Sequence, residues 1–186
     1  MVFPTRFNPD TSTSTLITAD AGSSYRVGPY RVQNVLGFAP GAPTSLADVE
    51  SALGHDDRCT GDQSEATVAW PARGVTGEFT TLSAFADPSG HPVTTPASPC
   101  QYRDQIQVDR LTASAAHWHT RRGLKIGDSI GRLQQLYPAA AEHDDGWWLH
   151  TVQLPWGGGE EQGDLLATVR NGKVSALTAV LAAEGD

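Results

Sequence analysis

One pattern occurs twice in this chain and constrains its fold more than any other feature of the sequence. Residues 44–54 and 128–138 each contain a residue that can cap a helix, an aliphatic stripe at helical spacing and a residue that breaks a helix. The stripes consist of Leu46, Val49 and Leu53 in the first copy, and of Ile130, Leu133 and Tyr137 in the second. Because such short helices are marginal alone, the pattern predicts two capped helices, each packed by one face against other structure.

Runs of strand-forming residues follow each predicted helix. After the first helix they occupy residues 66–70, 78–85 and 105–109, and after the second they occupy residues 147–154, 164–170 and 173–181. Asn171 and Gly172 separate the last two runs, and this dipeptide is typical of a type I′ hairpin turn. A helix followed by an antiparallel meander, twice over, predicts an α+β protein of two helix-plus-antiparallel-sheet units in tandem. We expect these units at residues 25–115 and 116–186, after a flexible Ser/Thr-rich tether at residues 1–24.

The charge of the chain bears on its partners. Its 186 residues include 13 basic and 21 acidic side chains, which gives a formal net charge of −8. An acidic surface repels phosphate backbones, so we expect no nucleic-acid partner. We also expect no membrane span, because no run approaches the roughly 20 apolar residues that a spanning helix needs.

The two cysteines, Cys59 and Cys100, lie in polar segments rich in Gly, Asp, Ser and Pro. This setting favours a disulfide, although two unpaired thiols of a cytosolic protein are the alternative. The lack of a Cys-x-x-Cys or Cys/His cluster argues against a metal or redox pair. Because a disulfide implies export, we expect a secreted or surface-anchored protein whose signal peptide is absent from this sequence, with residues up to about 24 as its tether.

The first predicted helix and its flanks resemble a known family. A capped helix at residues 45–54, followed by Cys59-Thr60-Gly61, looks like the repeat unit of the secreted tandem-repeat β-lactamase inhibitor proteins. Small envelope lipoproteins built on a helix-plus-sheet unit are similar. The resemblance implies that two units join their sheets into one shared concave surface that grips a partner protein. The second copy departs from this pattern, because it has no cysteine and Tyr137-Pro138 replaces the glycine.

Residues 127–131 match the Gly-x-Ser-x-Gly motif that presents a nucleophilic serine in α/β hydrolases. With His150 and Asp144 or Asp145 downstream, Ser129 could be such a nucleophile. The motif normally follows a buried parallel strand, whereas the preceding residues here are polar and the later ones indicate antiparallel strands. Ser129 can equally be the N-cap of the second helix. We therefore expect no catalytic residue, and a Ser129 hydrolase is the alternative.

His117 and His119 flank Trp118, a spacing at which two imidazoles on one face of a strand can bind zinc. His143 or His150 could supply a third ligand. An edge strand that alternates polar and apolar residues has the same letters without a metal. We expect neither a metal nor another cofactor.

Tryptophans and histidines gather in the second half of the chain. The candidate binding residues are Trp118, His119, Trp147, Trp148, His150 and Trp156. They are either large core residues or an anchor for a partner on an open sheet face, since tryptophan dominates interface hot spots. Alternation predicts Trp148 and His150 on one face of a strand and Trp147 on the other. We expect an exported, non-catalytic domain that binds a protein or cell-envelope partner; a surface lipoprotein without a defined ligand is a further alternative.

Overall fold

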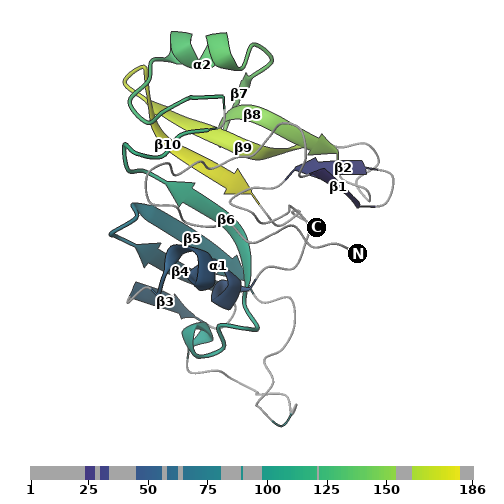
Figure 1. Cartoon of the computed structure of the whole chain (residues 1–186), viewed down its shortest axis with the longest axis vertical. Helices are drawn as coiled ribbons and strands as arrows, with labels where there is room; N and C mark the ends of the chain where they lie inside the picture. The colour runs from purple at the N-terminus through teal and green to yellow at the C-terminus, as the bar shows by residue number, and fades with distance from the viewer. Residues whose placement is uncertain are drawn as a thin grey trace.

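The computed structural model describes residues 24–27, 30–33, 45–55, 58–62, 65–80, 89, 98–120, 122–153 and 161–180. The helices are α1 (Leu46–Leu53), the short 3-10 helix η1 (Pro99–Gln101) and α2 (Ile130–Leu136). The strands of the main sheet are β3 (Arg58–Asp62), β4 (Glu65–Trp70), β5 (Val75–Thr80), β6 (Gln107–Ala113), β7 (Ala141–His143), β8 (Gly146–Gln153), β9 (Glu161–Arg170) and β10 (Lys173–Val180). A separate ribbon of β1 (Ser24–Val27) and β2 (Tyr30–Gln33) lies beside β8 (Figure 1).

The main sheet holds eight antiparallel strands in the order β3-β4-β5-β6-β10-β9-β8-β7 (Figure 1). At its middle β6 pairs with β10, where Leu111 lies opposite Ala179 and Ala113 lies opposite Leu177. The predicted fold class, an α+β protein of two helix-plus-sheet units, is therefore wrong, because the strands that follow the two helices form one continuous sheet. Each strand has a local signal, but no local signal in either β6 or β10 identifies the other as its neighbour.

Helix α1 begins and ends where the sequence predicts. The Ser45 hydroxyl accepts a hydrogen bond from the amide of Asp48, whose carboxylate accepts one from the amide of Ser45. This reciprocal capping box satisfies two amides that the helix leaves free. Gly54 follows the last turn with φ 95°, which favours glycine. The indole nitrogen of Trp70 donates to the Gly54 carbonyl at 2.8 Å, so β4 holds the end of the helix.

Helix α2 is capped and also supported by a turn. The Ser129 hydroxyl accepts a hydrogen bond from the amide of Arg132 at 3.2 Å. The Ile130 amide donates to the carbonyl of Gly172 at 3.1 Å, so the β9–β10 turn lies against the beginning of α2. Asn171 and Gly172 have φ values of 52° and 71°, the positive angles that a type I′ turn requires. The predicted hairpin turn is thus confirmed.

One hydrophobic core lies between the helices and one face of the sheet. Helix α1 contributes Leu46 and Val49, and α2 contributes Leu133, all with no exposed surface. The sheet contributes alternate residues, among them Leu111 and Leu177 in the central strands. Both helices therefore cover the same face, and among the described residues neither of them lies on the opposite face.

Some sequence-based predictions fall wholly or partly outside the described residues. Of the predicted tether at 1–24 only Ser24 is described, as the first residue of β1. Trp156 and the predicted strand residues 81–85 are not described. The boundary between residues 115 and 116 stays a prediction, although strands from the two sides of it pair. In the part of the chain that the structure describes, no helix is long and apolar enough to cross a membrane.

Candidate functional site

A row of side chains crosses five strands on the face of the sheet that lies opposite the helices. Pairing places five residues next to one another in turn: Thr76, Thr112, Thr178, Leu166 and Trp148. We call these five residues the threonine–tryptophan row. The adjacent row belongs to the core and includes Leu111, Ala179 and Leu165. Because successive residues of a strand point to opposite faces, the threonine–tryptophan row points away from the core.

The middle of this row is polar and its end is aromatic. The hydroxyl oxygens of Thr112 and Thr178 lie 3.0 Å apart, across the pairing of β6 with β10. Thr76 is exposed, Thr112, Thr178 and Trp148 are half-buried, and Leu166 is buried. The row therefore offers threonine hydroxyl groups and part of the Trp148 ring on rigid strands, and aromatic residues are enriched in protein interfaces.

Trp148 is held in one orientation by its neighbours. Its ring stacks on the imidazole of His143, with centroids 3.7 Å apart and planes inclined by 12°. The indole nitrogen donates to the carboxylate of Asp145 at 2.8 Å. Gly163 leaves the space that the ring needs, because a Cβ there would lie 2.9 Å from three ring atoms. A rigid aromatic side chain loses little conformational entropy when a partner covers it.

Two of the other predicted binding tryptophans are core residues. Trp118 is 1% exposed, and its indole nitrogen donates to the carbonyl of Arg73 at 2.6 Å. Trp147 is 8% exposed on the helix side of β8, and its indole nitrogen has no hydrogen-bond partner among the described residues. Alternation correctly separates Trp147 from Trp148, and the position of the helices decides which of them is buried. The rings of Trp118 and Trp147 pack inside the protein, so neither can contact a partner.

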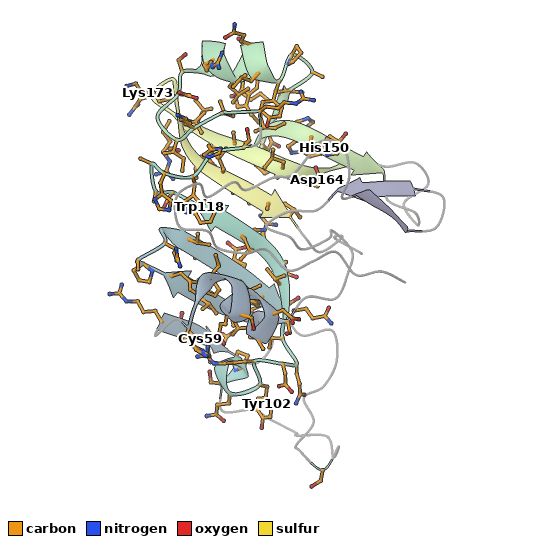
Figure 2. All side chains as sticks on the ribbon, viewed as in Figure 1. Cys59, Tyr102, Trp118, His150, Asp164 and Lys173 are labelled. Carbon is orange, nitrogen blue, oxygen red and sulfur yellow. A yellow bond between two sulfur atoms is a disulfide. The ribbon has the colours of Figure 1, made fainter. Side chains whose placement is uncertain are left out.

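His150 forms a buried polar pair with Asp164 toward the end of β8 and the beginning of β9 (Figure 2). The Nδ1 atom of His150 lies 2.7 Å from a carboxylate oxygen of Asp164, and the two side chains are 32% and 4% exposed. The hydrogen bond to Asp164 raises the pKa of His150 above its usual 6.5, although burial and the positive charge of Arg122 act in the opposite direction. The pair favours a protonated imidazole.

The predicted common face for Trp148 and His150 is wrong. Trp148 pairs with Leu166, but His150 pairs with Leu165, and a further shift in register follows before Thr151. Leu165 and Leu166 are consecutive and point to opposite faces, so their partners do as well. Such a bulge inserts an extra residue into one strand and reverses the alternation beyond it. His150 therefore lies in the row that faces the core, apart from the threonine–tryptophan row.

The remaining histidine candidates show no metal geometry. His117 is exposed, and the Nδ1 atom of His119 lies 3.0 Å from the carbonyl oxygen of Thr120. Within the described ranges no group of three His, Cys, Asp or Glu side chains could hold a metal ion. His143, a suggested third ligand, instead stacks on Trp148.

Ser129 lies at the beginning of α2, where its hydroxyl caps the helix. The pairings of the main sheet are antiparallel, so the buried parallel strand that supports a nucleophilic serine in α/β hydrolases is not found among the described residues. The residues of the Gly-x-Ser-x-Gly match act here as a turn and a helix cap. Gly127 has φ 96°, which suits such a turn.

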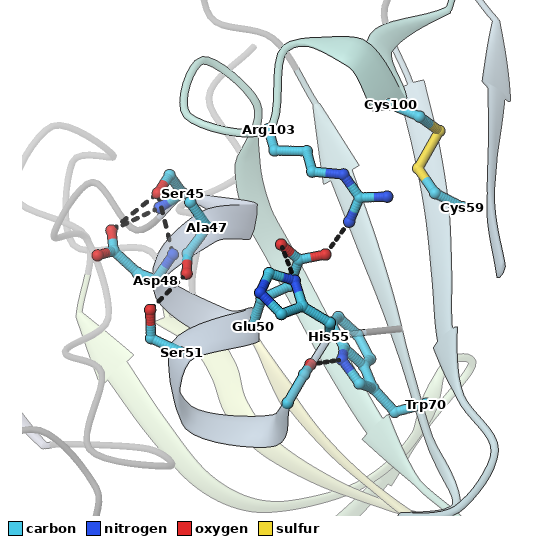
Figure 3. A network of polar contacts seen from close by, with 11 residues as sticks. Ser45, Ala47, Asp48, Glu50, Ser51, His55, Cys59, Trp70, Cys100 and Arg103 are labelled. Carbon is cyan, nitrogen blue, oxygen red and sulfur yellow. Dashed lines mark hydrogen bonds and ion pairs between the residues drawn. A yellow bond between two sulfur atoms is a disulfide. The ribbon is translucent and has the colours of Figure 1, made fainter. Parts of the chain in front are cut away.

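The predicted disulfide between Cys59 and Cys100 is confirmed and joins β3 to η1 (Figure 3). Close to it, Glu50 of α1 pairs with the guanidinium of Arg103 and lies 3.6 Å from Nδ1 of His55. The Glu50 side chain is only 4% exposed, and a buried carboxylate requires such partners. The arrangement binds α1 to the segment between η1 and β6, so its role is structural.

Sequence reasoning missed the three threonines of the threonine–tryptophan row. Alternation within residues 107–113 and 173–180 indicates that Thr112 and Thr178 point away from the core. Their alignment with Thr76 depends on which strands pair and in which register, and no local pattern gives this.

A scan against protein-family models found no match, and searches of curated proteins and of solved structures found none either. The resemblance to secreted β-lactamase inhibitor proteins therefore stays a hypothesis based on residues 45–61.

Proposed function

We propose that the protein is an exported, non-catalytic domain that binds a protein partner through the threonine–tryptophan row. The observation that carries this proposal is the position of the row, on a sheet face that neither described helix covers. The strands hold the side chains of this face in fixed positions, which reduces the entropy lost on binding.

The chemistry of the row suits a protein surface. Threonine offers a methyl group and a hydroxyl group on a side chain with few rotamers. Trp148 adds a large apolar surface at one end, and tryptophan is enriched among residues that dominate binding energy. Its contacts with His143 and Asp145 hold it in place before any partner arrives.

The disulfide supports the export part of this proposal. Disulfides persist in oxidising compartments such as the extracellular space and the periplasm, and they are rare in the cytosol. The resemblance of residues 45–61 to secreted inhibitor proteins points in the same direction and adds a partner protein as the expected ligand. A cell-envelope protein is the partner class that agrees with both.

Site-specific photo-crosslinking tests the proposed binding face. One variant carries benzoylphenylalanine in place of Thr76, on the threonine–tryptophan row, and a matched control carries it in place of exposed Gln134 on α2. We expect the Thr76 position to crosslink one partner from the envelope or extracellular fraction, and the Gln134 position to crosslink none. Equal crosslinking at both positions, or none at either, would refute the proposed face.

Substitution of the aromatic residues supplies the second arm of the test. Trp148→Ala should abolish capture of that partner while the circular dichroism spectrum stays that of the native protein. Trp147→Ala should instead unfold or strongly destabilise the protein, because its ring belongs to the core. Capture at wild-type strength by Trp148→Ala would remove Trp148 from the binding face.

A further inference from the structure

Four exposed basic side chains surround the beginning of α2: Lys125, Arg132, Arg170 and Lys173. We call these four residues the basic patch. The chain has a formal net charge of −8 and only two lysines, and both lysines belong to this patch. Figure 2 shows Lys173 at the end of the sheet that lies next to α2.

Backbone hydrogen bonds hold the patch together. The amide of Ile130 donates to the carbonyl of Gly172 at 3.1 Å, and the amide of Val174 donates to the carbonyl of Asp128 at 2.8 Å. Ser129 and Lys173 form a β-bridge between these two bonds. The β9–β10 turn and the start of α2 therefore form one surface, and the backbone positions of its four basic residues are fixed relative to one another.

Among the described residues, the cations of the patch form no ion pair with an acidic side chain. The nearby Asp128 carboxylate accepts a hydrogen bond from the backbone amide of Lys125 at 2.8 Å, and the guanidinium of Arg132 bonds to the neutral Gln135. No ion pair involves any of the four in the part of the chain that the structure describes. Other cations differ, since Arg103 pairs with Glu50 and Arg110 with Glu78.

The β9–β10 hairpin also places two of these cations directly opposite each other. Arg170 and Lys173 are partners across the turn, and like charges in this position destabilise a sheet. Between them Asn171 and Gly172 present little side-chain bulk, and a Cβ on Gly172 would have nothing within 4 Å. The surface between the cations is therefore open to an approaching group.

We propose that the basic patch docks an acidic segment of another protein. Four cations on one small rigid surface match a short segment rich in Asp and Glu, and opposite charges at an interface speed association and select the partner. A long polyanion fits less well, because the chain as a whole carries a formal net charge of −8. Nucleic-acid binding relies on many phosphate contacts, and anionic membranes attract clusters of roughly four to eight basic residues that lie beside a membrane-spanning helix or on an amphipathic helix. The patch instead lies on a turn and the start of a short helix, in a chain of net charge −8.

The test compares two double variants that remove the same charge. Lys125→Gln/Lys173→Gln alters the patch, and Arg58→Gln/Arg73→Gln is the control elsewhere on the protein. The probe is a fluorescent peptide of alternating glutamate and serine, and its binding is measured by anisotropy at low and at physiological salt. We expect roughly tenfold weaker binding by the patch variant, a change of less than about twofold by the control, and a smaller salt dependence for the patch variant.

Three outcomes would overturn the proposal. They are failure of the wild-type protein to bind the peptide, an equal loss of affinity in the two double variants, and tighter binding of the wild-type protein to duplex DNA or to phosphatidylserine-containing vesicles than to the peptide. Circular dichroism and urea unfolding of both variants confirm that each is folded as the wild-type protein is. Lys125, Lys173 and Arg58 are exposed and Arg73 is half-buried, and none of the four belongs to the hydrophobic core.

Discussion

Reduction of the Cys59–Cys100 disulfide is expected to lower the free energy of unfolding by about 4 kcal/mol. The two cysteines are 41 residues apart in the sequence. In the chain-entropy model a loop of this length removes about 13 cal/mol/K from the unfolded ensemble, which corresponds to about 4 kcal/mol at room temperature. Such a loss is a large part of the stability of a typical domain.

Urea unfolding followed by tryptophan fluorescence measures this effect, because buried Trp118 and Trp147 become exposed when the protein unfolds. The best comparison is wild-type protein with and without a reductant, since both forms keep the two sulfur atoms. Compared with the reduced wild-type protein, the Cys59→Ala/Cys100→Ala variant lacks only the packing contacts of the two sulfur atoms. The reduced form should also show a steeper dependence on urea, because its unfolded chain exposes more surface.

A loss below about 1 kcal/mol would refute this reasoning. It would mean that other contacts already restrict the same loop in the unfolded chain, or that the bridge strains the folded state. Within the described residues β3 also contacts η1 directly, and the ion pair of Glu50 with Arg103 joins α1 to the segment that follows η1. A reduced Glu50→Gln variant would show whether that pair accounts for the missing effect.

Two further predictions concern β8 and β9. Folding raises the pKa of His150, so its contribution to stability is complete below the unfolded pKa of about 6.5 and is lost as pH rises through the folded pKa. The free energies of unfolding of the wild-type and His150→Gln proteins, measured in urea, should therefore differ more at acidic than at alkaline pH. NMR titration of the Asp164→Asn variant should give a lower pKa for His150 than in the wild-type protein, and an unchanged pKa would contradict the pairing. Gly163→Ala should lower the free energy of unfolding by about 1–3 kcal/mol, because its Cβ would collide with the Trp148 ring. The control Gly131→Ala in α2, whose Cβ meets only one atom at 3.9 Å, should raise it by about 0.5–1 kcal/mol. Equal effects of the two substitutions would contradict this account.

Local signals gave the parts of the fold that depend on neighbours in sequence. Ser45 and Ser129 cap helices because their hydroxyls reach amides three residues on. Asn171 and Gly172 form their turn because both tolerate positive φ. The disulfide was indicated by the polar surroundings of its cysteines, although not by any geometry.

Pairing between distant strands is the part that the sequence does not reveal. β3 consists of Arg58–Asp62, and Thr60 is its one residue of the β-branched and aromatic types that favour strands, so its conformation depends on pairing with β4. β7 has only three residues. The joining of β6 to β10, which makes one sheet, likewise depends on contacts between residues more than 60 positions apart, as for Thr112 and Thr178.

The candidate site shows the same limit on a smaller scale. In residues 147–150, alternation predicts the faces of Trp147 and Trp148 correctly. At the bulge beside His150 the register shifts, and the His150 side chain lies on the core face. A bulge forms where cross-strand contacts favour it, and here a hydrogen bond joins His150 to Asp164 across that point. Because no residue in 147–150 marks this choice, the face of His150 could be found only from the structure.

The tryptophans that lie close together in the sequence have different roles on the two faces of the sheet, core packing on one and a proposed binding role on the other. The helix face takes Trp118 and Trp147, whose removal would leave large cavities. The opposite face keeps Trp148, and its cross-strand partner there is the apolar Leu166 rather than a further threonine. In this apolar pair Leu166 is 4% exposed and Trp148 is half-buried, so the Trp148 ring is the part that a partner can contact. A binding role for this face therefore requires that Trp148 contribute more to partner affinity than to the stability of the free protein, and the two can be measured separately in the same Trp148→Ala variant.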